Sequence, residues 1–253
     1  MSQSIQFAII HIPHASTVIP EKYLSSFDQS KLLHETDVLT DWFMDELIGF
    51  HPGRIISPVS RLVCDMERFR NDGDEIMAER GMGAVYTRCS DGTTLKTVTA
   101  EEREDILTEY YDPHHKWLSH AAGMTLWQCR SCLIIDLHSF HPEPLPCDLD
   151  QTPGRPDFCI GTDPFHTPAR LTEGLYDFLV GRGYSVKIDS PFSGTMVPLR
   201  YYRKEKGIHS IMIEVNRRLY LDAPGVKSKD FDRTGNLLNE AITLLEKLNI
   251  NRY

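Results

Sequence analysis

The chain has 253 residues, of which 41% are hydrophobic and 25% are charged, and its formal net charge is −9. This composition is typical of a globular protein, and the absence of a basic run argues against nucleic acid as a partner. No apolar run reaches the roughly 18 residues needed to span a bilayer, so we expect no membrane partner. The N-terminus lacks the basic region of a signal peptide, and the six cysteines form no dense framework, so we expect a cytoplasmic protein.

Apolar runs rich in β-branched residues alternate with amphipathic helical patterns along the chain. The strand-like runs are Ile5–Ile12, Arg54–Val63, Ser131–Leu137, Asp157–Gly161, Ser185–Ile188 and Ile208–Val215. The helical patterns are Ser30–Ile48, Thr99–His120, Thr167–Gly181 and Arg233–Leu248, and Thr99-x-x-Glu102 is a capping-box pattern. This alternation predicts a three-layer α/β sandwich. Since no shift in composition marks a boundary, we expect one domain over residues 1–253.

Two long segments, Asp72–Thr97 and Phe140–Pro156, carry neither pattern and are expected loops. Loops of this length in a compact domain are often lids or binding loops. The chain has no phosphate-binding Gly-rich loop, no Gly-x-Ser-x-Gly elbow and no His-Glu-x-x-His helix. The candidate chemistry therefore comes from scattered polar residues.

Two histidines follow apolar strand-like runs. His14 comes just after the first run, and His138 ends the run that carries Asp136 two residues earlier. Ligand sites in α/β sheets gather beyond the carboxyl ends of strands. Side chains alternate along a strand, so Asp136 and His138 share a face, and Asp136 could orient a metal-bound His138. The alternative is that each of these residues is structural or merely solvated.

Glu214 is a carboxylate inside an otherwise apolar strand-like run. A carboxylate in such a place must be paired, bound to a metal or raised in pKa, and a raised pKa suits a general base. The alternative is a structural ion pair with Arg217 or Arg218.

The segment from Glu35 to Asp41 is rich in acidic residues. Asp37 and Asp41 are one helical turn apart and would share a helix face. One carboxylate of this segment and two histidines from elsewhere could complete a three-ligand catalytic zinc site, which leaves a position for water. The alternative is an exposed acidic helix face.

Three arginines, Arg61, Arg68 and Arg70, surround one strand-and-turn segment. The guanidinium group binds a carboxylate in a bidentate way, which suits an anionic substrate. Surface arginines are common, so each could also be a solvated side chain.

Together these residues resemble the N-formylglutamate amidohydrolase family over about residues 8–222. The resemblance rests on an ordered series of motifs: Ile12-Pro-His14-Ala-Ser16, Asp37-x-x-x-Asp41, Ser60-Arg61-Leu-Val-Cys-Asp65-Met-Glu67-Arg68, Tyr111-Asp-Pro113-His-His115, Asp136-Leu-His138-Ser139, Ser190-Pro-Phe-Ser193-Gly194 and Ile213-Glu214-Val-Asn216-Arg217-x-Leu-Tyr220.

The resemblance implies a fold related to zinc carboxypeptidases and aspartoacylase, an α/β/α sandwich with a mixed central sheet. It implies one Zn²⁺ per chain, held by His14, His138 and an acidic residue of the Glu35–Asp41 segment, for which we favour Asp37. Glu214 matches the base. The implied reaction is the hydrolysis of N-formyl-L-glutamate, or of a close N-acyl acidic amino acid, to formate and glutamate, a step of histidine degradation.

The expected substrate is therefore a small anionic amido acid. We assign its binding to Arg61, Arg68, Arg70, Ser193, Gly194 and Asn216, with Arg68 also placing the amide for catalysis. One departure bears on the substrate: the family usually carries Asp-x-Asn-Arg where this chain has Asp65-Met-Glu67-Arg68. The extra negative charge would weaken attraction for an anion.

Two other functions are compatible with these residues. One is a zinc carboxypeptidase-like or other N-acyl amino-acid hydrolase, which a panel of substrates would separate from the first. The other is a non-catalytic binding protein on the same fold, which would need neither zinc nor Glu214. The retention of both histidines and Glu214 disfavours it.

Overall fold

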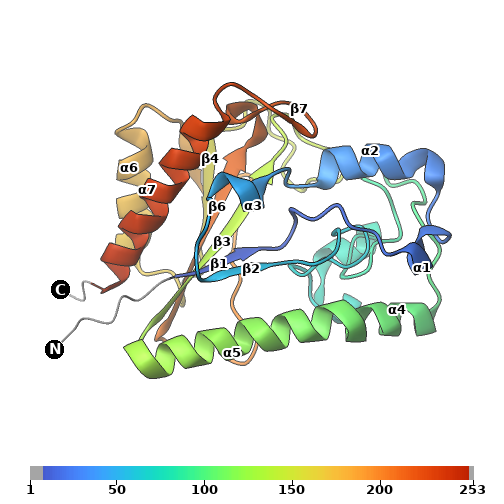
Figure 1. Cartoon of the computed structure of the whole chain (residues 1–253), viewed down its shortest axis with the longest axis horizontal. Helices are drawn as coiled ribbons and strands as arrows, with labels where there is room; N and C mark the ends of the chain where they lie inside the picture. The colour runs from blue at the N-terminus through green and yellow to red at the C-terminus, as the bar shows by residue number, and fades with distance from the viewer. Residues whose placement is uncertain (1–7, 251–253) are drawn as a thin grey trace.

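The computed structural model describes residues 8–250 and is built around a six-stranded sheet (Figure 1). The order across the sheet is β2-β1-β3-β6-β4-β5. The β4–β6 pair is antiparallel and the other four pairs are parallel, so β4 and β5 run opposite to the other four strands. The sheet is therefore mixed, as expected. The strands are β1 (Ile9–Ile12), β2 (Arg54–Ile56), β3 (Cys132–Phe140), β4 (Phe158–Gly161), β5 (Val186–Ile188) and β6 (Ile208–Asn216).

Helices cover both faces of this sheet, which gives three layers (Figure 1). On one face α6 (Ala169–Val180) and α7 (Phe231–Ile250) bury their apolar sides against alternate residues of β1, β3 and β6. On the other face α5 (Asp112–Cys129) packs on β1, β3 and β6 through Leu118 and Ala122. The predicted α/β/α sandwich is confirmed.

The middle of the sheet is fully buried. Strands β3 and β6 pair in parallel over nine residues each, from Cys132 opposite Ile208 to Phe140 opposite Asn216. Nearly every residue of both strands is buried, which explains their continuous apolar runs. Polar side chains within these two strands are therefore costly unless they are paired, and they mark the site described below.

The expected strand Arg54–Val63 is wrong beyond Ile56. Strand β2 stops there, and the chain continues as turns. Pro58 has no N–H to donate to a ladder, and the Ser57 hydroxyl donates to the carbonyl of Val59. The chain leaves the sheet at this point and enters the loop region that carries Arg61 and Asp65.

The expected single helix Ser30–Ile48 is also wrong, because it is two helices. Helix α2 (Gln29–Leu39) ends at Thr40, whose backbone is extended, and α3 (Met44–Leu47) begins after Phe43, whose φ is +58°. In the break, the backbone N–H of Asp41 donates to the carbonyl of His14 at 3.0 Å. Asp37 and Asp41 therefore do not share a helix face, and Asp41 is tied to the end of β1 instead.

The expected helix Thr99–His120 consists of three joined segments. These are α4 (Ala100–Ile106), one π-helical turn η3 (Leu107–Tyr111) and α5. The predicted capping box is present: the Thr99 hydroxyl accepts from Glu102 N at 3.1 Å, and the Glu102 carboxylate accepts from Thr99 N at 2.8 Å. This continuous rod brings His114 and His115 under the carboxyl ends of the central strands.

Of the two long loops, the first has partial structure, and the second contains no named helix or strand after Phe140. The first contains the short 3-10 helices η1 (Asp72–Asp74) and η2 (Ile76–Arg80), and its apolar residues share a second core with α2 and α4. The remaining elements are α1 (Glu21–Leu24), η4 (Arg217–Leu219), β7 (Leu221–Ala223) and β8 (Val226–Lys227). The expected run Ile5–Ile12 corresponds to β1, and its first three residues lie outside the described residues. Between residues 8 and 250, no helix combines the length and apolar content needed to cross a membrane.

The capping box provides a test of the helical rod. Thr99→Ala removes the acceptor for Glu102 N and should lower the free energy of unfolding by about 1 kcal/mol. Asp105→Asn, an exposed position within α4, is the matched control and should change it far less. Urea unfolding followed by circular dichroism measures both, and equal stabilities would show that the cap does not hold α4.

Candidate active site and metal centre

Polar side chains gather at the carboxyl ends of β1, β3 and β6, on the face that α5 covers. Alternation along each strand places His11, Asp136, His138 and Glu214 on this face. His138 and Glu214 are direct register partners on neighbouring strands. The same edge of the sheet therefore receives two of the residues that the sequence singled out.

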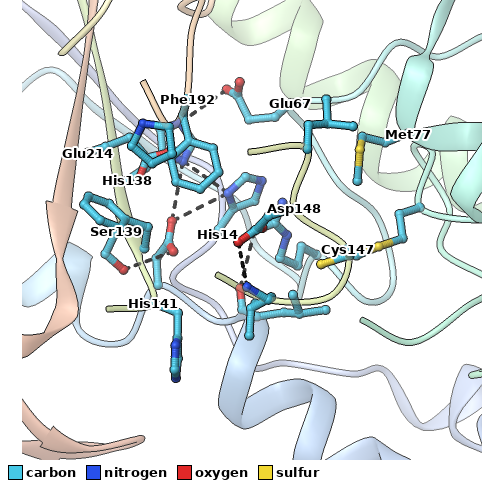
Figure 2. Close-up of a pocket in the computed structure, with 18 of the residues that line it drawn as sticks. His14, Glu67, Met77, His138, Ser139, His141, Cys147, Asp148, Phe192 and Glu214 are labelled. Carbon is cyan, nitrogen blue, oxygen red and sulfur yellow. Dashed lines mark hydrogen bonds and ion pairs between the residues drawn. The ribbon is translucent and has the colours of Figure 1, made fainter. Parts of the chain in front are cut away.

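A cavity of about 370 Å³ opens over this edge (Figure 2). His14, Asp41, His138 and Glu214 lie at its wall. Both long loops contribute to the lining, through Met77 and Met82 from the first and through Leu145, Cys147, Asp148 and Arg155 from the second. The expectation that these loops form part of the binding site agrees with this placement.

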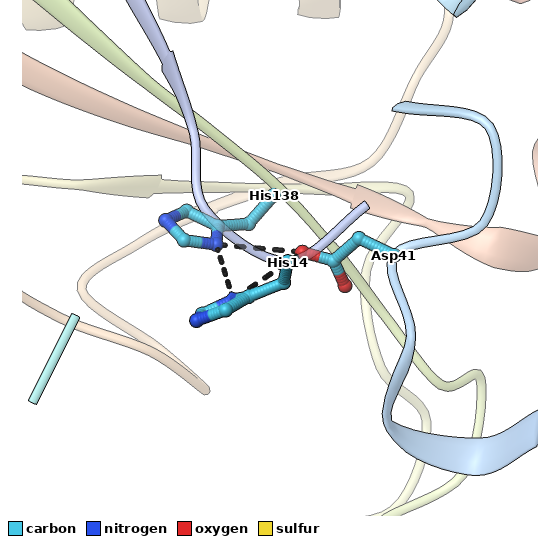
Figure 3. Close-up of side chains that lie close together, drawn as sticks. All are labelled: His14, Asp41 and His138. Atoms are coloured by element: carbon cyan, nitrogen blue, oxygen red, sulfur yellow. Dashed lines mark hydrogen bonds and ion pairs between the residues drawn. The ribbon is translucent and has the colours of Figure 1, made fainter. Parts of the chain in front are cut away.

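His14, Asp41 and His138 converge on one point in this wall (Figure 3). The Nδ1 atoms of His14 and His138 are 3.2 Å apart. Asp41 Oδ2 lies 3.6 Å from His14 Nδ1 and 3.5 Å from His138 Nδ1. All three side chains are buried. Two nitrogens and one carboxylate oxygen thus face one another.

Each histidine has a carboxylate behind it. His14 Nε2 makes a 2.8 Å hydrogen bond with Asp65 Oδ1. His138 Nε2 lies 3.0 Å from Asp136 Oδ1, at ion-pair distance but without hydrogen-bond alignment. A carboxylate at Nε2 favours the tautomer with its proton there, which leaves the Nδ1 lone pair free to bind a metal.

The donor set fits a metal ion. Donor atoms around a tetrahedral zinc at Zn–N distances of 2.0–2.1 Å lie about 3.3 Å apart, close to the spacing found here. Asp41 Oδ2 is buried and accepts no hydrogen bond, although burial of such an oxygen is costly. Burial opposes a charge on His138, but Asp136 and Asp41 raise its pKa well above its usual value. The group therefore favours a positive charge, which a proton on His138 or a bound cation would supply.

The structure brings Asp41, and not Asp37, to the histidines. Asp37 stays on α2, where its backbone carbonyl accepts from Trp42 Nε1. Glu35, the other acidic alternative, is buried and accepts hydrogen bonds from Ser90. The break after α2 sends the chain to β1, so Asp41 takes the place beside the histidines that we expected for Asp37.

Asp41 is held in place by a second set of contacts. Its Oδ1 accepts from the Ser139 hydroxyl and from Arg217 Nη2, both at 3.1 Å. Burial opposes ionisation, but His138 and His14 hold the pKa of Asp41 well below its usual range. Asp41 therefore turns one oxygen to the protein and the other to the metal position.

Glu214 is the unpaired acid of the cavity. It is buried, and its Oε2 has no hydrogen-bond partner. Burial raises the pKa of Glu214 to about 8. The ion pair considered from sequence is not formed, since Arg217 pairs with Asp41 and Arg218 with Asp157. A carboxyl group in this state is suited to exchange a proton near neutral pH.

The three predicted substrate arginines differ in their surroundings. Arg61 and Arg68 line the cavity. Arg61 is engaged with Asp65 through Nε and Nη2, whereas Arg68 Nε has no hydrogen-bond partner. Arg70 does not line the cavity and pairs with Glu104 and Asp112 outside it. Of the three, Arg68 lines the cavity with an N–H group that makes no hydrogen bond, and its longer ion pairs are 3.7 Å to Asp65 Oδ2 and 3.9 Å to Glu75 Oε1.

The other predicted binding residues also divide. Ser193 lines the cavity, and Gly194, at φ +89°, lines a smaller adjoining one together with Ser193. Asn216 is fully buried: its amide donates to the Pro156 carbonyl, and its oxygen accepts from Arg218 N. Asn216 thus shapes the turn that presents Arg217 and does not line the cavity.

Several site residues escaped the sequence analysis. Arg155 lines the cavity with Nε and Nη1 unpartnered, while its Nη2 binds Asp148 at 2.7 Å. No motif surrounds it, and its place in a long loop was the only available signal. Asp65, Glu67 and Arg217 stood inside the family motifs, but sequence spacing could not show which groups they would meet.

The family model for N-formylglutamate amidohydrolase matches residues 7–221. The chain belongs to the N-formylglutamate amidohydrolase family. The match covers His14, Asp41, His138 and Glu214, and it confirms the resemblance inferred from the motifs. An amidohydrolase is therefore the class of enzyme to which the site belongs. No curated protein sequence gives a significant match.

Two solved structures share the fold of this N-formylglutamate amidohydrolase family member. One is an N-formylglutamate amidohydrolase from Ralstonia eutropha JMP134, with a TM-score of 0.83 at 18% identity over 97% of this chain and 95% of that one. The other is a gene product of Agrobacterium tumefaciens, with a TM-score of 0.69 at 17% identity over 94% of this chain and 89% of that one. At such low identity the likeness concerns the fold.

Asp37 and Asp41, which the sequence pattern placed on one helix face, provide a matched pair of variants. Asp41→Asn should remove one divalent cation per chain relative to the unaltered protein, because it replaces the only carboxylate of the triad. Asp37→Asn should leave the metal content unchanged. Elemental analysis after gel filtration measures both, and loss of metal from the Asp37 variant alone would return the ligand to Asp37.

Proposed function

We propose that this protein is a zinc-dependent amidohydrolase that cleaves N-formyl-L-glutamate, or a close N-acyl acidic amino acid, to formate and glutamate. The observation that carries the proposal is the pairing of two contrasting groups in one cavity. A buried His14–Asp41–His138 triad offers a cation position, and Glu214 beside it has an unpartnered carboxyl oxygen. A metal position with a raised-pKa acid next to it suits hydrolysis by water.

In this mechanism His14, Asp41 and His138 would hold a zinc ion, which would supply Lewis-acid polarisation. Glu214 accepts the proton of the attacking water, whose oxygen bonds to the acyl carbon. Glu214 then returns that proton to the nitrogen as the carbon–nitrogen bond breaks, so that the products are an amine and a carboxylic acid, which loses its proton to solvent at neutral pH. Asp65 and Asp136 keep the imidazoles of His14 and His138 oriented.

Two arginines of the cavity have N–H groups to offer to an anionic substrate. Arg68 has an unpartnered Nε, and Arg155 has an unpartnered Nε and Nη1. Arg61 and Arg217 also line the cavity but are occupied by Asp65 and Asp41. N-formylglutamate carries two carboxylates, so we assign one to Arg68 and one to Arg155. This assignment favours an amino acid with an acidic side chain over a neutral one.

The base is tested by Glu214→Gln, which keeps the shape of the side chain but cannot accept the proton. We expect kcat for N-formylglutamate to fall roughly 10²–10⁴-fold, with metal content unchanged because Glu214 is not in the triad. Steady-state kinetics with elemental analysis and a melting curve distinguish the roles. A normal kcat with metal in place would remove Glu214 as the base, and loss of metal would make it a ligand.

The substrate arginines are tested by Arg68→Met and Arg155→Met, with Arg70→Met as the matched control outside the cavity. A charge-assisted hydrogen bond contributes about 1.5–3 kcal/mol, so each cavity variant should lose about 10- to 150-fold in kcat/KM. N-formylglutamine lacks the side-chain carboxylate. Replacement of the arginine that binds that group should therefore lower kcat/KM much less for N-formylglutamine than for N-formylglutamate. Equal kinetics for all three variants would contradict the assignment.

A further inference from the structure

A second group of potential metal donors lies next to the first. His11 from β1, Glu67 from the loop after β2 and Asp136 from β3 present three donor atoms within 4.8 Å of one another. His11 Nδ1 is 3.1 Å from Glu67 Oε1 and 2.9 Å from Asp136 Oδ1. His11 and Asp136 are fully buried, and the Glu67 side chain is 17% exposed. These spacings are slightly shorter than the 3.2–3.6 Å of the first triad.

Within the part of the chain that the structure describes, the carboxylates of this second group have imidazole rings as their ion-pair partners and no arginine or lysine. Asp65 is paired with Arg61, and Asp41 is paired with Arg217. The ion pairs of Glu67 and Asp136 within residues 8–250 are formed with His11 and His138 alone. Two carboxylates therefore face each other across imidazole rings. Burial of such charges is costly unless a positive charge lies between them.

Unpartnered atoms point into the same space. Glu67 Oε1 is buried without a hydrogen bond. His138 Nε2, which carries the proton when Nδ1 faces the first group, has no aligned hydrogen-bond partner on a side chain only 6% exposed, and lies 3.0 Å from Asp136 Oδ1 and 3.9 Å from Glu67 Oε1. The imidazole of His138 thus turns Nδ1 to the first group and Nε2 to the second, and its ring separates them (Figure 2 shows His138 and Glu67).

His11 is oriented as a metal ligand would be. Its Nε2 lies 2.9 Å from His114 Nε2, so one of these two nitrogens must carry a proton. If His11 is the donor, its Nδ1 lone pair faces Glu67 and Asp136. In that tautomer a cation between Nδ1 and the two carboxylates removes the repulsion, whereas a proton on Nδ1 would instead make the 2.9 Å hydrogen bond to Asp136 Oδ1. His114 thereby takes the place that a carboxylate takes behind His14.

We propose that His11, Glu67 and Asp136 form a second divalent-cation site, one imidazole ring away from the first. One nitrogen and two carboxylate oxygens are a donor set that zinc accepts. The cation balances the charge that Glu67 brings to the cavity wall beside Arg68. The negative charge that would repel an anionic substrate at this position is thereby neutralised. An asparagine at position 67, as the family usually carries, would not supply the carboxylate ligand of this second site.

The test is zinc stoichiometry on the full chain. Metal-free protein is titrated with Zn²⁺ and the bound metal is counted by elemental analysis and calorimetry. We expect two Zn²⁺ per chain for the unaltered protein and one for both Glu67→Gln and His11→Asn. Glu79→Gln, an exposed glutamate of the neighbouring loop, is the control and should keep two. Retention of one Zn²⁺ shows that the variants are folded.

The pattern of losses separates this site from the first one. Asp41→Asn should also retain one Zn²⁺, and combining it with Glu67→Gln should leave none. If the unaltered protein and Glu67→Gln both bind one while Asp41→Asn binds none, the second site is refuted and the first stands. In that event a protonated His11 bridges the two carboxylates. Two Zn²⁺ on the Glu67 and His11 variants would equally refute it, and no Zn²⁺ on the unaltered protein would refute both sites.

Discussion

The site depends on imidazole rings held against carboxylates in the buried end of the sheet. Asp65 holds His14 through Nε2, and Asp136 lies behind His138. Each ring is therefore oriented before any ligand arrives, with its Nδ1 toward Asp41. Removing one partner of a buried ionic pair typically costs about 3–5 kcal/mol, because the other charge is left without compensation. These contacts therefore couple the stability of this region to the geometry of the site.

Asp65 and Asp41 are in turn held by arginines, which explains part of the arginine content of the cavity wall. Arg61 binds Asp65, and Arg217 binds Asp41. Both are thus used to stabilise the acids that orient or complete the triad. Arg68 and Arg155 retain unpartnered N–H groups at the cavity wall. All four side chains carry the same charge, so their hydrogen-bond partners decide which arginines stabilise the site and which could bind a ligand.

Glu214 differs from the other acids because it lacks a strong partner. Asp41, Asp65 and Asp136 are buried too, but their partners keep their pKa values low. Burial without such a partner raises the pKa of Glu214 to about 8. Neighbouring carboxylates on one sheet edge are thereby given different protonation states. The groups with depressed pKa values suit a cation, and the group with a raised pKa suits proton transfer.

The amino-acid sequence alone was enough to predict the layers of the fold and most strands and helices. Buried parallel strands require long apolar runs, so a histidine or glutamate within them is visible as an exception, as His138 and Glu214 are. The ordered motifs likewise identified the family, which the match over residues 7–221 confirms. Those inferences needed only local pattern and order along the chain.

Contacts between distant segments could not be inferred in this way. Asp37 and Asp41 are equivalent on a continuous helix, and only the break at Thr40, together with the hydrogen bond from Asp41 N to His14 O, distinguishes them. Arg70 and Arg68 are two residues apart, yet α4 and α5 draw Arg70 away through Glu104 and Asp112. Arg155 lines the cavity with its guanidinium group over the rings of Phe140 and Phe192. In each case the partner lies far along the chain, and its distance is set by packing, which no local pattern records.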